Sequence, residues 1–239
     1  MDVSEKPRRI KGLIFDKDGT LFDFAATWES WAKAFLIRLC DGDRGRAARM
    51  GAVIGFDFDA GRFARDSLVI AGTPLEIGAA LQPYFPDLSP EKLVALINEE
   101  AAQAPQVAAV PLRPLLTDLV NKGLRLGVAT NDAEAPARAH LEQAGVTGFF
   151  DFIAGCDSGH GGKPAPGQLL AFAAATGLAP AEIAMIGDST HDLHAARAAG
   201  TVAIGVLTGP AEAATLRPLA DVVLADIGAL PGWLATAVD

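Results

Sequence analysis

Residues 10–21 constrain the fold most, because an apolar segment there leads directly into two aspartates. Its apolar, β-branched and aromatic residues predict a buried strand of a parallel sheet, and Gly19-Thr20 ends it. Residues i and i+2 of an extended chain point to the same side, so Asp16 and Asp18 are expected to face one pocket while Lys17 points away. Two neighbouring carboxylates repel unless a divalent cation or a shared proton offsets their charge. Taken alone, the segment is equally compatible with an aspartate-rich turn without a function.

The composition is that of a globular protein with room for a substantial core. Half of the residues are hydrophobic and 21% are charged, which is a globular balance. A length of 239 residues suits either one α/β domain or a domain with a modest insertion. A net charge of −9 argues against nucleic acid as a partner, because binding a phosphate backbone needs a basic surface. Cys40 and Cys156 have no paired spacing, which argues against a disulfide scaffold or a zinc site and suits a reducing compartment.

The start of the chain and its longest uncharged run give no sign of secretion or of a membrane. Residues 1–9 are polar and charged, and the apolar segment that follows lacks the pattern of a signal peptide. The uncharged run from 164 to 181 is rich in alanine and is interrupted by Gly167, Gly177 and Pro180, so it is not expected to span a bilayer. We therefore expect a cytoplasmic protein.

From Pro111 onward, helix patterns alternate with strand patterns. The expected helices are 113–121, 133–144, 166–176, 190–199 and 227–238, and the expected strands are 124–130, 151–154, 183–187, 201–206 and 221–224. This alternation predicts an α/β fold with a doubly wound parallel sheet, covered by helices on both faces.

Residues 25–106 show a different pattern, which is helical and has no strand alternation. Thr27 is a plausible N-cap for a helix over 28–39, and Ser89-Pro90 is a good start for another. The change of pattern predicts an inserted, all-helical cap domain at 25–106, over a core formed by 1–24 and 107–239.

Three further polar segments follow expected strands, like the first pair of aspartates. Thr130-Asn131 follows the strand at 124–130, Lys163-Pro164 lies in the next loop, and Asp188 follows the strand at 183–187. In parallel α/β sheets, ligands bind beyond the carboxyl ends of the strands. The four segments are therefore expected to converge on one site.

In this order the four segments resemble the motifs of the haloacid dehalogenase-like phosphohydrolases. The pattern is most similar to the phosphoglycolate-phosphatase branch, whose members have a Rossmann-like core and a helical cap. Asp23 matches that branch, whereas Lys17 stands where it usually carries an apolar residue and Phe24 where it usually carries Ser or Thr. The resemblance covers residues 10–24 and about 124–206.

The resemblance implies a Mg²⁺-dependent phosphatase that works through an aspartyl phosphate. Asp16 would attack phosphorus, and Asp18 would protonate the departing alcohol and then deprotonate water. The carboxylates of Asp16 and Asp188, with the backbone carbonyl of Asp18, would bind Mg²⁺, which favours hard oxygen ligands. The expected partner is a small phosphorylated metabolite, because a cap that closes over a site excludes larger molecules.

The remaining motif residues would bind the phosphate and orient its partners. Thr130 and Asn131 lie where a strand turns into a helix, so their hydroxyl and backbone N–H groups can take phosphate oxygens, although a simple helix cap explains them as well. Lys163 would place a positive charge against Asp16 and the phosphate. Asp192, one helical turn after Asp188, would orient Lys163 or a metal-bound water without binding the metal itself.

Three alternatives remain open at this stage. A haloacid dehalogenase shares the fold and the nucleophile, but that chemistry needs neither Asp18 nor a metal. A phosphohexose mutase keeps all four motifs and needs cap cations for a second phosphate; the candidates, called the cap cations below, are Arg44, Arg46, Arg49, Arg62, Arg65 and Lys92. A non-catalytic binding protein would be favoured by loss of a motif residue, and none is lost. His160, in a glycine-rich loop, is a further candidate for contacting the substrate, and the sequence does not indicate the substrate or the oligomeric state.

Overall fold

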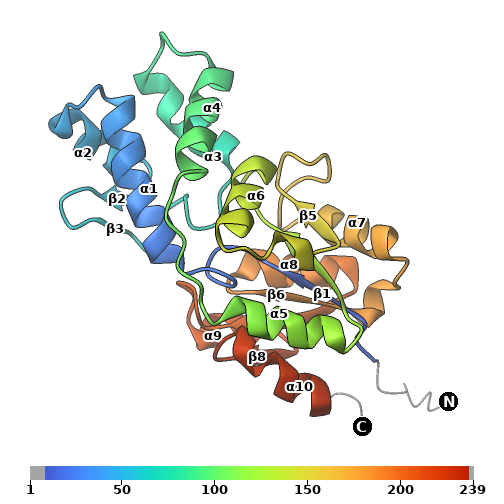
Figure 1. The fold of residues 1–239 in the computed structure, drawn as a ribbon. Helices are drawn as coiled ribbons and strands as arrows, with labels where there is room; N and C mark the ends of the chain where they lie inside the picture. The colour runs from blue at the N-terminus through green and yellow to red at the C-terminus, as the bar shows by residue number, and fades with distance from the viewer. Residues whose placement is uncertain (1–8, 237–239) are drawn as a thin grey trace.

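The computed structural model of the protein describes residues 9–236 and contains one six-stranded, fully parallel sheet (Figure 1). The spatial order of its strands is β5-β4-β1-β6-β7-β8, so β1 lies between β4 and β6. The strands are β1 Gly12–Phe15, β4 Arg125–Ala129, β5 Phe152–Ala154, β6 Ile183–Gly187, β7 Val202–Val206 and β8 Val222–Leu224. The predicted doubly wound parallel sheet is confirmed. The polar lead-in at 1–8 and the last two residues of the predicted helix at 227–238 lie outside the described part.

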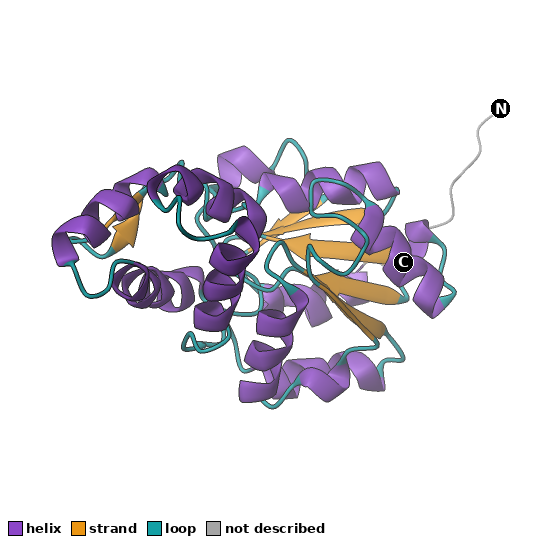
Figure 2. Ribbon diagram, turned by 90° about the horizontal axis from the view of Figure 1, so that it is seen from above, coloured by secondary structure: helices purple, strands orange, loops and turns teal. Residues whose placement is uncertain are grey.

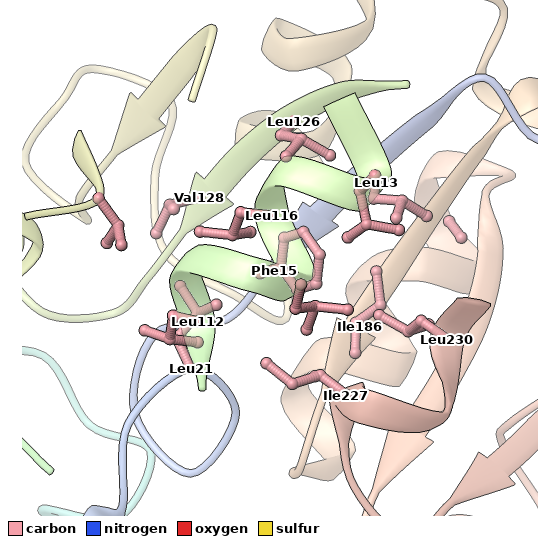
Figure 3. Close-up of a cluster of buried hydrophobic side chains, with 14 of the residues drawn as sticks. Leu13, Phe15, Leu21, Leu112, Leu116, Leu126, Val128, Ile186, Ile227 and Leu230 are labelled. Carbon is pink, nitrogen blue, oxygen red and sulfur yellow. The ribbon is translucent and has the colours of Figure 1, made fainter. Parts of the chain in front are cut away.

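Helices cover both faces of the sheet, as the alternating strand side chains require. Leu13 and Phe15 of β1 pack into one hydrophobic cluster, while Ile14 packs into another on the opposite face. Figure 3 shows the first cluster, in which leucines of α5 meet Phe15 and Ile186. Its helices are α5 Leu112–Asn121, α6 Glu134–Gln143 and α10 Leu230–Thr236, and those of the other cluster are α7 Gly167–Thr176, α8 Thr190–Ala199 and α9 Ala213–Leu216.

A helical domain with its own core lies beyond one end of the sheet (Figure 2). Its core runs from Phe24 to Ala104 and includes Trp31 and Phe35, whose rings stack with centroids 5.0 Å apart. The elements are α1 Phe24–Leu39, α2 Arg44–Val53, α3 Pro74–Leu81, the 3₁₀ turn η1 Gln82–Tyr84 and α4 Pro90–Ala101. Because its buried side chains form a separate cluster, we propose 25–106 as the boundaries of the cap domain.

Two details of the cap differ from the sequence-based prediction. The cap is not entirely helical, because β2 Phe56–Asp57 and β3 Arg62–Phe63 form a short antiparallel ladder. Strands of two residues are too short to produce a recognisable alternation. The first helix begins earlier than expected, at Phe24, and its N-cap is Asp23 instead of Thr27.

The Asp23 carboxylate accepts a hydrogen bond from the backbone N–H of Ala26 at 2.8 Å, which is the usual geometry of an aspartate cap. Thr27 lies inside the helix, where its hydroxyl donates to the Asp23 carbonyl oxygen. The predicted Ser89 cap with Pro90 in the first turn of α4 is confirmed. Within residues 9–236, no helix combines the length and apolarity that crossing a membrane requires.

The capping role of Asp23 predicts a specific stability effect. Asp23→Ala removes the side-chain acceptor and should lower the free energy of unfolding by about 1 kcal/mol, whereas Asp23→Asn keeps an acceptor and should cost much less. Urea unfolding followed by the fluorescence of Trp28 and Trp31 measures both. Equal losses in the two variants would contradict this cap.

Candidate active site

The predicted site residues meet at the carboxyl ends of the central strands, under the cap. A cavity of about 40 Å³ lies there, room for roughly three water molecules. Its lining from the sheet side includes Asp16, Asp18, Thr130, Asn131, Lys163 and Asp192. Asp188 is buried beside them, with 4% of its surface exposed. The predicted convergence of the four segments is therefore present in the structure.

Lys163 is the cation of this site and is fully engaged. Its Nζ lies 2.8 Å from Oδ1 of Asp16 and 2.7 Å from Oδ1 of Asp192, and it donates to the carbonyl oxygen of Ala129 at 2.8 Å. Burial by itself would lower the pKa of Lys163, but the two carboxylates outweigh it and raise the pKa. The ammonium therefore stays charged and fixes the orientation of Asp16.

Asp16, Asp188 and Asp192 form an acidic group whose carboxylate oxygens lie within 4.8 Å of one another. Burial raises the pKa of Asp16 to about 7, Lys163 opposes this shift, and the charges of Asp192 and Asp18 add to it. Burial, with the charges of Asp192 and Asp16, also raises the pKa of Asp188 well above its usual value. A divalent cation bound to these oxygens would remove that repulsion, so the group fits the expected Mg²⁺.

Asp192 differs from the other two carboxylates because both of its oxygens already have protein partners. One oxygen meets Lys163, and the other accepts hydrogen bonds from the backbone N–H and the hydroxyl of Ser189, at 3.0 and 2.7 Å. Asp192 also closes a capping box at the start of α8. These contacts suit a residue that orients Lys163 more than one that binds a metal directly.

Two glycines leave the space around the Asp188 carboxylate open. A Cβ added at Gly209 would overlap Oδ2 of Asp188, and one at Gly19 would lie within 2.5 Å of the same group. Gly19 also has a φ of +74°, which disfavours any other residue. A side chain at either position would displace the carboxylate or fill the space in front of it.

Asp18 is held by a second lysine, which the sequence pattern placed away from the pocket. Lys17 does not line the cavity, as expected, and its side chain is fully buried. Its Nζ lies 2.7 Å from Oδ2 of Asp18 and 3.3 Å from Oδ2 of Asp132, and it contacts Nδ1 of His140 at 2.9 Å. Each aspartate of the first motif therefore has its own buried ammonium group.

His140 extends this contact to the cap. Burial and the positive charge of Lys17 lower the pKa of His140 to about 4, so its ring is neutral at pH 7. Nδ1 then accepts a hydrogen bond from Lys17, and the Nε2–H donates to the carbonyl oxygen of Ala101, the last residue of α4, at 2.7 Å. Asp132 could have been found as the charged residue next to Asn131, but no local signal links His140 with a residue 123 positions earlier.

Asn131 joins two loops above the sheet. Its side-chain amide donates to the carbonyl oxygens of Ala71 in the cap and of Lys163, and its side-chain oxygen accepts from the backbone N–H of Lys163. The Thr130 hydroxyl accepts a hydrogen bond from the backbone N–H of Asp132. The side chain of Asn131 thus positions Lys163 and the cap.

Residues 10–200 match the haloacid dehalogenase-like hydrolases. This chain belongs to that family. The match spans the strand, loop and helix units that carry all four polar segments.

Individual relatives place this haloacid dehalogenase-like hydrolase among phosphatases. A protein named probable phosphatase IndB from Dickeya dadantii is 33% identical over 205 residues, which cover 82% of this chain and 81% of the relative. A phosphoglycolate phosphatase from Salmonella typhimurium is 28% identical over 217 residues, covering 86% and 84%.

Solved structures share the fold of this hydrolase, but their names give different activities. A HAD phosphatase from Thermococcus onnurineus superposes with a TM-score of 0.66 at 22% identity, covering 94% of this chain and 98% of the other. A β-phosphoglucomutase from Clostridium difficile reaches a TM-score of 0.65 at 18% identity, covering 96% and 97%. The fold therefore does not distinguish a phosphatase from a mutase.

The cap cations of this hydrolase do not line the cavity. Arg44 lies over the ring of Phe58, and Arg46 lies over the ring of Phe85 and donates to a backbone carbonyl. Arg65 is 2.9 Å from Glu212 in an exposed ion pair. The remaining three, Arg49, Arg62 and Lys92, are exposed.

His160 and His191 differ in their position relative to the cavity. His191 lines the cavity from the start of α8, while His160 is exposed beside the ring of Phe152 and does not line it. The suggestion that His160 contacts a substrate therefore has no support from its position.

The space left by Gly209 predicts a defect in metal binding. Gly209→Ala places a methyl group against Asp188. It should weaken Mg²⁺ binding by about tenfold or more, because the displaced Asp188 carboxylate would no longer coordinate the cation. Gly148→Ala is the matched control, since nothing lies within 4 Å of the added Cβ. Titration calorimetry with Mg²⁺ measures both, and equal affinities would contradict Asp188 as a ligand.

The buried position of Lys17 predicts a pH-dependent loss of stability. Lys17→Met leaves Asp18 and Asp132 without their cation and should cost about 3–5 kcal/mol at pH 8. Burial already raises the pKa of Asp132 to about 6 against the opposing charge of Lys17, so removal of Lys17 raises it further. Asp132 is then protonated more readily in the folded than in the unfolded chain, and part of the loss should be recovered as the pH falls to 5.5.

Urea unfolding of the wild type and Lys17→Met at the two pH values tests this expectation. The double variant Lys17→Met with Asp132→Asn should regain stability at pH 8, because one uncompensated charge is gone. A loss of stability that is the same at both pH values would contradict the ion pairing.

Proposed function

We propose that this hydrolase is a Mg²⁺-dependent phosphatase of the phosphoglycolate-phosphatase-like branch, which cleaves a small phosphomonoester through an aspartyl-phosphate intermediate. The observation that carries the proposal is the pairing of Asp16 with Lys163 beside Asp188, with Asp18 lining the same cavity. The arrangement would supply a nucleophile, a fixed positive charge and an acid–base group around one space.

In the first step, an oxygen of the Asp16 carboxylate attacks phosphorus and the bond from phosphorus to the alcohol oxygen breaks. Asp18 donates its proton to that departing oxygen. In the second step, Asp18 takes a proton from water, the water oxygen attacks phosphorus, and the bond to Asp16 breaks. Atoms and charges balance, because Asp18 regains in the second step the proton that it gave in the first.

The other residues would hold the phosphate in place for both steps. The Lys163 ammonium faces the Asp16 oxygen and would attract the phosphate oxygens, while Asp192 keeps Lys163 oriented. The Thr130 hydroxyl and the backbone N–H of Asn131 would bind further phosphate oxygens. Mg²⁺, held by the Asp16 and Asp188 carboxylates and the Asp18 backbone carbonyl, would supply the charge that lets an anionic nucleophile approach an anionic ester.

The alternatives receive less support from the site. A mutase needs a cation for a second phosphate, and the cap cations do not line the cavity. A dehalogenase needs no acid–base residue where Asp18 stands, and a binding protein does not need the complete set of Asp16, Asp18, Lys163 and Asp188.

The test is phosphate release from a panel of small phosphomonoesters, including phosphoglycolate, with Mg²⁺ or with a chelator. Asp16→Asn should abolish release. Asp18→Asn should slow it by about 10²- to 10⁴-fold, the usual contribution of acid–base catalysis, while Mg²⁺ still binds. Release that survives in Asp16→Asn, or conversion of glucose-phosphate isomers without release, would contradict the proposal.

A further inference from the structure

We infer that the alcohol part of the substrate is uncharged and apolar, so that a phosphomonoester with a second acidic group, such as phosphoglycolate, is a poor substrate. This inference rests on the phosphatase function proposed above and concerns the same cavity. It follows from the side chains that the cap places opposite the catalytic aspartates.

The cap lines the cavity with an apolar surface. Of the cap residues, all of which the structure describes, none that lines the cavity is charged, and the indole of Trp28 offers the one side-chain N–H. The larger members are Trp28, Val69, Ile70, Ile77 and Ile97, with Phe24 at the start of α1, and the smaller residues Ala71, Gly72 and Pro74 complete the surface. The rings of Phe24 and Trp28 lie with centroids 6.5 Å apart, so this surface also has an aromatic section.

The charges on the sheet side make a second anionic group on the substrate, besides its phosphate, still less favourable. Asp16, Asp18, Asp132 and Asp192 line the cavity, against one lysine, Lys163. That lysine already meets two carboxylates and a carbonyl oxygen, and it faces the place of the phosphate. A carboxylate on the substrate would be buried against apolar side chains without a cation, which costs far more than burying a methyl group.

The polar side chains that remain suit a neutral partner. Ser189 and His191 line the cavity from the start of α8. The His191 ring can hydrogen-bond a hydroxyl or a carbonyl group, and the Ser189 hydroxyl, which already donates to Asp192, can accept from a hydroxyl. The pattern of one apolar wall with a few polar groups is typical of a site for an uncharged organic group. The substrate class is therefore a phosphate ester of a neutral alcohol with an apolar or aromatic part.

The experiment compares two esters of matched shape, isobutyl phosphate and phosphoglycolate, with the Mg²⁺-loaded enzyme. Two methyl groups of the first take the place of the two carboxylate oxygens of the second. We expect kcat/KM for isobutyl phosphate to exceed that for phosphoglycolate by about tenfold or more. Equal values, or a preference for phosphoglycolate, would overturn the inference and leave the phosphatase function intact.

The two esters also differ in the reactivity of their leaving groups. A pair of variants removes this difference, because each variant is judged by the ratio of the same two kcat/KM values. Ile70→Arg places a cation on the partly exposed edge of the apolar surface, and should shift the ratio of the two kcat/KM values towards phosphoglycolate by about tenfold. Ile70→Met, of similar length and neutral, should change that ratio by less than about twofold. An unchanged ratio in Ile70→Arg would overturn the inference. Absence of release from every ester would instead contradict the phosphatase function, and the inference would fall with it.

Discussion

Two buried ammonium groups allow this protein to gather five carboxylates under its cap. Lys163 pairs with Asp16 and Asp192, and Lys17 pairs with Asp18 and Asp132. An unpaired buried carboxylate would take up a proton or unfold the site, because its desolvation is not repaid. The pairing thus gives each aspartate of the first motif its own counter-ion. Asp188 lacks such a partner within this arrangement and is the position where a divalent cation would contribute most.

The register of the parallel sheet brings these groups together. Phe15 of β1 lies opposite Val128 of β4 and Ile186 of β6, so the residues after these strands emerge side by side. The side chains of Asp16, Thr130 and Asp188 therefore come from three adjacent strand ends, although they are far apart in the chain. The position of β1 at the centre of the sheet explains why its carboxyl end carries Asp16, the proposed nucleophile.

The cap covers the carboxyl ends of the central strands and determines the polarity of the cavity there. It is tied to the core by hydrogen bonds from Asn131 to Ala71 and from His140 to Ala101, and by the position of Trp28 over Lys17 at 5.5 Å. The same loops and helices bring apolar side chains to the cavity and leave the cap cations outside it. The cap thus closes the site and, in the same contacts, distinguishes charged from uncharged leaving groups.

The sequence by itself determined the alternation of strands and helices and the positions of the polar segments. The strand 183–187 and the helix 190–199 were predicted to the residue, because their apolar patterns are bounded by a glycine and by a serine cap. The prediction of Thr27 as the cap of α1 was wrong, because both residue types cap helices and the sequence does not show which one precedes the first turn. Asp23 accepts from the backbone N–H of Ala26, whereas the Thr27 hydroxyl donates to the Asp23 carbonyl oxygen.

The tertiary structure alone decided which of the many charged residues meet. Lys17 bonds a histidine 123 positions away, and the cap cations turn out to face rings, an exposed carboxylate or solvent. Periodicity reports which face of an element is buried, but not which distant side chain lies across from it. The positions of the candidate site residues could therefore be predicted from local motifs, whereas their counter-ions and the polarity of the cap depended on long-range packing.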